Sequence, residues 1–213
     1  MWMIMNTQPD SRKGMYRSPA GTRSPSSFPH TFFRAWTLGL LFLALFSSVS
    51  ATASGAETPS AGQVKAAMVY SIAKFVDWPA DTFADANAPF TICVVGKGPL
   101  VAGIESLKGQ NVKNRKVLIR QVTKPEEAEG CQILLIGDSA RRQVPEMMNR
   151  LGKQSTMTIS DLPNFAENGG VVGFVEDEGK VRFEINLGAA QHSRIHISAQ
   201  LLRLAKKILG VDR

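Results

Sequence analysis

A glycine-rich turn near the middle of the chain is the first place where the sequence could bind a ligand. Gly96 and Gly98 stand between a predicted strand and a predicted helix, as the glycines of a dinucleotide-binding loop do. The position of the third glycine holds Val101, and Pro99 removes a backbone amide that could donate to a phosphate. We therefore interpret the segment as a turn and expect neither a nucleotide nor another cofactor.

A serine and two histidines could also carry chemistry, but each lacks a required companion. Ser139 follows Gly137 and an apolar strand, as in the GDS block of one esterase family, yet neither nearby histidine has an aspartate three residues before it to form the D-x-x-H base. We interpret Ser139 as a helix N-cap. His192 and His196 have the spacing of a metal pair on a helix, but no third ligand stands near them. We expect no catalytic residue and no metal site.

The two cysteines are more informative. Cys93 and Cys131 each lie at or just before an apolar stretch, in a chain whose N-terminal segment has the composition of an export signal. Thiols in an oxidising compartment tend to pair. A bond between them would close a span of 38 residues, which stabilises a fold by about 4 kcal/mol in the chain-entropy model. The alternative is two separate buried thiols, and we favour the disulfide.

The N-terminal segment indicates export to the periplasm. Residues 1–34 carry five basic side chains, residues 35–46 are largely apolar, and small residues follow up to Ala53. This order is typical of a secretory signal. A membrane anchor is the alternative, but the uninterrupted apolar run over 38–46 is shorter than the roughly 20 residues that span a bilayer. We predict a signal peptide over 1–53, starting at Met1 or Met15, a flexible leader over 54–62 and one domain over 63–210.

The charge of the chain gives no reason to expect nucleic-acid binding. The formal net charge is +7, but residues 1–53 hold five basic residues against one acidic residue. Residues 54–213 hold twenty basic residues against seventeen acidic ones. More than half of the positive excess therefore lies in the segment that we expect to be removed.

Patterns of strands and helices alternate along the predicted domain. Ser60 and Gln63 can form a capping box before a helix that Pro79 stops. The apolar residues that recur there at helical spacing are Val64, Ala67, Met68, Ile72, Phe75 and Val76. The other predicted elements are strands over 90–96, 116–122, 132–136 and 156–160, helices over 99–107 and 139–151, a hairpin of 171–176 with 180–186, and a closing helix over 198–209. This order predicts a single α/β domain with a mixed sheet of five to six strands flanked by helices.

Several stretches together resemble the YfiR family of small periplasmic proteins. The stretches are KFVDWP (74–79), FTIC (90–93), ILLI (133–136), TISD (158–161) with Phe165 and Gly169-Gly170, VRFEIN (181–186) and ISAQLLRLA (197–205), and it is their combination that carries the resemblance. The resemblance covers nearly all of residues 63–210. It implies a repressor that binds the periplasmic domain of an inner-membrane diguanylate cyclase, and a peptidoglycan-associated outer-membrane lipoprotein that sequesters the repressor. The best-known members carry two disulfides, whereas this chain can form only the one matching Cys93–Cys131.

The strand over 180–186 holds the residues that we expect to contact a partner. Its apolar side chains share one face, and Arg182, Glu184 and Asn186 share the other. Glu184 either forms an ion pair beside Arg182 or contacts a partner, and the resemblance places this strand in the repressor surface. Trp78 is either a core residue or an aromatic edge offered to the same partner.

The sequence therefore favours a non-enzymatic periplasmic regulator that represses cyclic di-GMP synthesis through protein contact. The alternative is a periplasmic small-molecule sensor or binding module, in which the α/β crevice holds a ligand. An enzyme ranks third, because no nucleophile–base pair survives inspection. The identity of the partner and the formation of a homodimer stay open.

Overall fold

The computed structural model describes residues 59–152 and 154–211. The predicted signal peptide, and the predicted leader up to residue 58, lie outside the described residues. Among the described helices, none combines the length and the apolar composition that a bilayer crossing requires.

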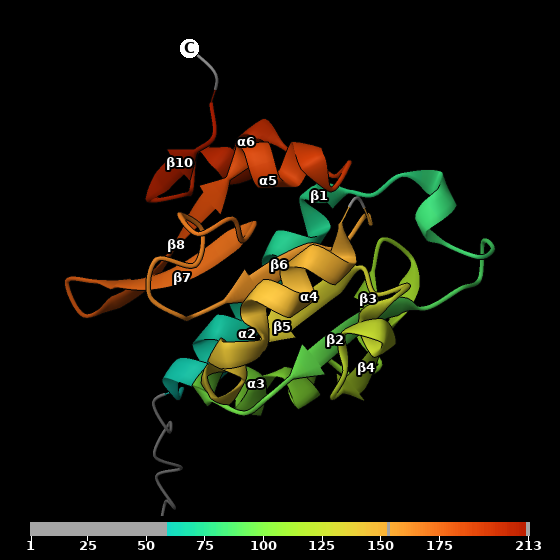
Figure 1. Cartoon of the computed structure of the whole chain (residues 1–213), viewed down its shortest axis with the longest axis horizontal. Coiled ribbons are helices and arrows are strands. Elements are labelled where there is room, and N and C mark those ends of the chain that lie inside the picture. The colour runs from blue at the N-terminus through green and yellow to red at the C-terminus, as the bar shows by residue number, and fades with distance from the viewer. Residues whose placement is uncertain (1–58, 153, 212–213) are drawn as a thin grey trace, which may run out of the picture. The chain divides into compact units, whose positions relative to one another are not determined.

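The apolar runs of the sequence form the centre of an eight-stranded mixed sheet with the order β10-β8-β7-β6-β5-β2-β4-β3 (Figure 1). Neighbouring strands from β4 to β7 are parallel, β8 runs antiparallel to β7, and β10 runs parallel to β8. The strands are β2 (Phe90–Val95), β3 (Asn111–Val112), β4 (Arg115–Val122), β5 (Ile133–Ile136), β6 (Met157–Ser160), β7 (Val172–Asp177), β8 (Lys180–Asn186) and β10 (Lys207–Leu209). A separate antiparallel pair joins β1 (Val76–Asp77) to β9 (His196–Ile197).

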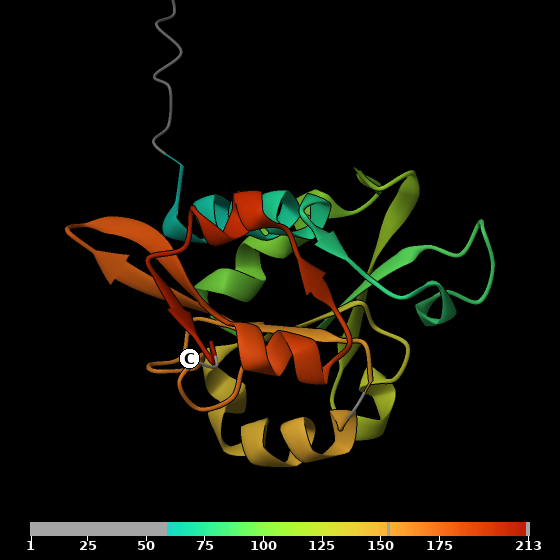
Figure 2. The same cartoon turned by 90° about the horizontal axis from the view of Figure 1, so that it is seen from above.

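Helices cover both faces of the sheet, which explains why every residue of β2 and β5 is buried. The helices are α2 (Ala61–Lys74), α3 (Pro99–Gly103), α4 (Val144–Leu151), α5 (Leu187–His192) and α6 (Ala199–Leu202), with 3-10 turns η1 (Ala80–Thr82), η2 (Ile104–Leu107), η3 (Pro125–Ala128) and η4 (Asp138–Gln143). Helices α2 and α3 lie on one face and α4 on the other (Figure 2). Each face has its own apolar cluster, one with Ile72 and Leu100 and the other with Met147 and Leu151.

Helix α2 begins as its sequence predicts and buries the predicted Ile72, but its first two turns bury other residues than predicted. Ser60 Oγ accepts from the Gln63 amide at 3.2 Å, and Gln63 Oε1 accepts from the Ser60 amide at 2.7 Å, which is the predicted capping box. The predicted apolar positions Val64 and Ala67 are exposed. The buried positions are Gly62, Ala66, Val69, Ile72 and Ala73.

The close approach of α3 decides which side of α2 faces the core. A Cβ atom on Gly62 would lie 2.3 Å from the carbonyl oxygen of Pro99, and one on Gly103 would lie 2.3 Å from the carbonyl oxygen of Gly62. The two backbones touch through these glycines. The smallest residue of the first turn therefore faces the core, and the larger Val64 does not.

The prediction of an α/β domain with a mixed sheet is confirmed, but the expected five to six strands are eight. The added strands are β3 and β10. The closing helix over 198–209 is wrong: α6 ends at Leu202, the Lys206 amide donates to the Phe183 carbonyl at 2.8 Å, and β10 pairs with β8. The open edge of β8 offers backbone hydrogen bonds to this segment, and these outweigh its helical periodicity.

Candidate functional site

The predicted disulfide is confirmed, and it joins neighbouring parallel strands. Cys93 lies in β2 and Cys131 just before β5, with their Cα atoms 5.8 Å apart and both side chains buried. Arg120 of β4 lies in register with Cys93. Its Nε donates to Cys93 Sγ at 3.3 Å, and its Nη2 donates to Cys131 Sγ at 3.1 Å and to the Glu129 carbonyl at 2.7 Å. Arg120 was not among the residues predicted from the sequence, although a basic side chain within the predicted strand 116–122 was a visible signal.

The turn over residues 96–98, at the carboxyl end of β2, packs against the turn over residues 137–139, at the carboxyl end of β5. The Lys97 amide donates to Ser139 Oγ at 2.8 Å, and the Ser139 amide donates to the Lys97 carbonyl at 3.1 Å. A Cβ atom on Gly137 would lie 2.7 Å from that same carbonyl oxygen. The hydroxyl of Ser139 therefore ties the two turns together. The N-cap prediction for Ser139 is wrong, because Gly137 occupies the N-cap of η4.

The two histidines do not share a helix. His192 is the last residue of α5, His196 lies in β9, and both side chains are exposed. Over residues 59–152 and 154–211, no three His, Cys, Asp or Glu side chains come together as metal ligands would.

The predicted partner-binding residues occupy two opposite faces of the sheet. Phe183 and Ile185 of β8 are buried in the cluster on the α2 face, so Arg182, Glu184 and Asn186 point to the other side. Trp78 packs against the α2-face cluster: its ring meets the Phe90 ring edge-on at 5.0 Å, and its Nε1 donates to the Gln132 carbonyl at 3.1 Å. The structure thus brings three of the four residues onto one face and separates Trp78 from them.

Asn186 already uses its side chain inside the fold. Its Oδ1 accepts from the Ala189 amide at 2.9 Å, which caps α5, and its Nδ2 donates to the Ala166 carbonyl at 2.8 Å. Arg182 is exposed and Glu184 is half-buried. Of the three residues on this face, Arg182 and Glu184 have the freer side chains.

A lysine of the neighbouring strand lies beside Glu184. Strand β10 places Lys207 in register with it, so β8 is not the edge of the sheet. A hydrogen bond to Glu167, at 2.6 Å, raises the pKa of Lys207, and the charges of Glu167 and Glu184 act in the same direction. Lys206 donates to Asp177 at 2.7 Å and so lowers the pKa of that carboxyl. Glu184 therefore lies beside Lys207 of β10, on the sheet face that also carries Arg182 of β8.

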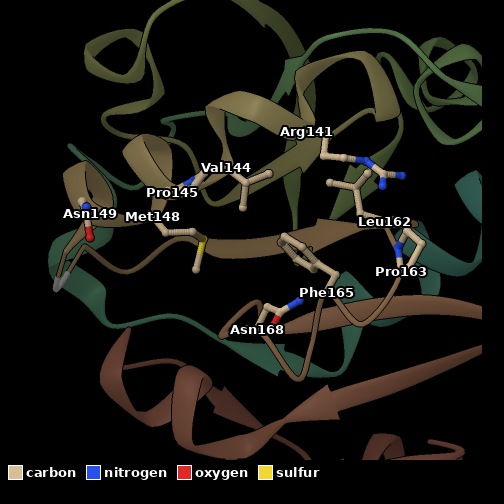
Figure 3. A pocket seen from close by; sticks show the side chains of 9 residues that line it. All are labelled: Arg141, Val144, Pro145, Met148, Asn149, Leu162, Pro163, Phe165 and Asn168. Atoms are coloured by element: carbon tan, nitrogen blue, oxygen red, sulfur yellow. The ribbon is translucent and has the colours of Figure 1, made fainter.

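A hollow of about 520 Å³ lies between α4 and the segment that follows β6; we call it the α4 pocket (Figure 3). One wall comes from η4 and α4, which follow β5, and the other from residues 162–168. Its lining residues are Arg141, Val144, Pro145, Met148, Asn149, Leu162, Pro163, Phe165 and Asn168. A second, more polar hollow of about 430 Å³ shares Met148 and Asn149 with it. The α4 pocket could not be predicted from the sequence, because its walls meet only in the folded chain.

A partly buried ion pair anchors the start of the segment that follows β6. Lys65 Nζ of α2 lies 2.6 Å from Asp161 Oδ2, and the two side chains are 17% and 11% exposed. The second carboxylate oxygen, Asp161 Oδ1, is buried without a hydrogen-bond partner. This pair connects α2 to the carboxyl end of β6.

Comparisons with known proteins place the domain in a family. The YfiR/HmsC-like family model matches residues 62–206. Two solved structures are similar in part: the ABC domain in complex with L-Trp from Streptococcus pneumonia (14% identity, TM-score 0.47) and a conserved domain protein from Vibrio cholerae O1 biovar El Tor (17% identity, TM-score 0.46). In each case the match covers 70% of this chain and 60% of the other. No curated protein matches this chain.

Proposed function

This chain belongs to the YfiR/HmsC-like family, and from that membership we propose that it is an exported regulatory protein. Its partner is the periplasmic domain of an inner-membrane diguanylate cyclase, which it binds and holds inactive, so that cyclic di-GMP synthesis falls. The family match over residues 62–206, nearly the whole described domain, carries this proposal. A peptidoglycan-associated outer-membrane lipoprotein is the proposed antagonist, which sequesters the regulator and releases the cyclase.

The disulfide supports the periplasmic location in this proposal. Cys93 and Cys131 are bonded and buried, and disulfides persist in oxidising compartments such as the periplasm. The role requires no catalytic group of its own, because repression acts through contact with the cyclase.

Arg182 and Glu184 form the centre of the proposed contact surface. Both lie on the face of β8 that points away from Phe183 and Ile185. Glu184 is half-buried, so a partner could complete its desolvation without a large rearrangement. Asn186 would act indirectly, because its side chain caps α5. Trp78 would have a structural role rather than a contact role, because it packs on the α2 face of the sheet and donates to the Gln132 carbonyl.

The test is a pair of glutamate substitutions in one hairpin. Glu184→Ala removes the proposed contact, and Glu176→Ala, an exposed position of β7 on the other face of the sheet, is the matched control. Loss of one member of a desolvated charge pair costs about 2–5 kcal/mol of binding. We therefore expect Glu184→Ala to abolish repression and raise cyclic di-GMP in cells that contain the cyclase, while Glu176→Ala represses fully.

Thermal unfolding of the purified variants separates binding from folding. The half-buried Glu184 side chain accepts no hydrogen bond from the described residues, and Lys207 keeps its bond to Glu167, so both variants should melt close to the wild type. If Glu184→Ala unfolds early, the residue is structural. If the variant is stable and represses fully, the proposed surface is wrong.

A further inference from the structure

We propose that the α4 pocket binds a small molecule that has a flat apolar body and one anionic group. The proposal rests on the position, size, lining and charge of the pocket. It does not depend on the cyclase, so the two proposals can fail separately.

The pocket lies where a sheet of this order leaves space for a ligand. In open α/β sheets, ligands bind beside the carboxyl ends of the strands, at the point where the strand order reverses. Here the order reverses at β2, between β4 and β5. The turns around Lys97 and Ser139 fill that point, because their backbones bond directly to each other. The next opening lies between the segments that follow β5 and β6, and these segments form the two walls of the α4 pocket.

The lining suits a planar ring. Leu162 and Phe165 are 7% and 3% exposed and form a fixed apolar floor, while Val144 and Met148 are half-buried on the wall. Met148 and Phe165 come from opposite walls and point into the same space (Figure 3). Thioether sulfur and phenyl edges both pack well against aromatic rings. The volume of about 520 Å³ lies within the ~300–1,000 Å³ of small-molecule sites.

A positive charge at the rim of the pocket favours a ligand with a negative charge. Arg141 is the one ionisable residue among those that line the pocket. Its guanidinium lies 3.1 Å from Asp138, and both side chains are more than half exposed, so this ion pair holds Arg141 only weakly. The guanidinium can therefore turn to a carboxylate or sulfonate, and the amides of Asn149 and Asn168 add hydrogen-bond donors. A cationic ligand would meet Arg141 as a like charge.

Two dyes of similar shape and different charge test the proposal on the full exported protein. The anionic probe is 8-anilinonaphthalene-1-sulfonate, and the neutral probe is N-phenyl-1-naphthylamine. We expect saturable binding of the anionic dye by fluorescence titration. With methyl-13C methionine, the signal of Met148 should shift on binding, while that of Met68, on α2 across the sheet, should stay unchanged. Absence of saturable binding, or equal shifts of both signals, would overturn the proposal.

Neighbouring arginines supply the matched variants. Arg141→Gln should weaken the anionic dye about 1.5- to fivefold, the range for an exposed ion pair. The neutral dye should bind Arg141→Gln as it binds the wild type. Arg142→Gln, an exposed position that does not line the pocket, should leave both affinities unchanged. Equal losses in the two variants, or no loss in Arg141→Gln, would refute recognition of an anion by Arg141.

Discussion

Replacing Lys65 with Met should destabilise the domain more than replacing its partner Asp161 with Asn. The ion pair joins α2 to the carboxyl end of β6, at 2.6 Å. Without Lys65, the carboxylate of Asp161 loses its ion-pair partner in a site where Oδ1 already lacks a hydrogen bond. Without the carboxylate, Lys65 can extend its long side chain towards water. The two substitutions should therefore lower the stability by different amounts, although they break the same ion pair.

The exposure of the two side chains sets the magnitude. Removing one partner of a fully buried ion pair costs about 3–5 kcal/mol. Lys65 and Asp161 are 17% and 11% exposed, so solvent screens part of the remaining charge. We expect Lys65→Met to cost about 2–3 kcal/mol and Asp161→Asn to cost about 1 kcal/mol. The double variant should be more stable than Lys65→Met, because the amide carries no charge that must be buried.

Thermal and urea unfolding of the wild type, the two single variants and the double variant measure these changes in stability. For a domain of this size, about 2–3 kcal/mol lowers the melting temperature by roughly 5–10 °C. Lys108→Met is the control, because Lys108 is exposed at the end of η2, and its melting temperature should stay near that of the wild type. A cost below about 0.5 kcal/mol for Lys65→Met, the scale of surface substitutions, would show that the ion pair does not stabilise the domain. A larger loss of stability in Asp161→Asn than in Lys65→Met would contradict the predicted order.

Three further predictions concern the disulfide, the acid response and export. Cys93→Ser should lose about 2–4 kcal/mol of stability, and dithiothreitol should lower the melting temperature of the wild type but not of the variant; two free thiols in the unreduced wild type would contradict this. Backbone amides of Thr123 and Lys124 donate to Glu127 and lower its pKa, so this carboxylate contributes stability above its unfolded-state pKa and loses it as the pH falls through the folded-state pKa. Glu127→Gln should therefore destabilise at pH 7, and the difference from the wild type should shrink towards acid pH; a difference that is the same at all pH values would show that charge is not involved. Mass spectrometry of the exported protein should find cleavage after Ala53, and a mature chain that retains residues 38–46 would exclude the signal peptide.

Local patterns in the sequence determined most elements of the fold. The capping box at Ser60 and Gln63 set the start of α2, because both of its bonds join residues three apart. The glycine turn at Gly179 set the hairpin of β7 and β8, since its positive φ of 72° is a conformation that glycine adopts without strain. The disulfide was also predictable, because the N-terminal segment indicates an oxidising compartment and two cysteines have one possible intramolecular pairing. The shared face of Arg182, Glu184 and Asn186 on β8 followed from the alternation of the strand, whereas their proposed contact role came from the family resemblance.

The rest depended on contacts between distant parts of the chain. The face that α2 buries was decided by the approach of Gly103, and residues 207–209 became a strand because the edge of β8 was open. Asn186 became a helix cap rather than a free side chain because α5 begins beside it. The α4 pocket exists because Met148 and Phe165, seventeen residues apart, follow adjacent strands. Periodicity along a segment states which residues could share a face, but only the neighbouring backbone decides which face is buried and which hydrogen bonds are available to it.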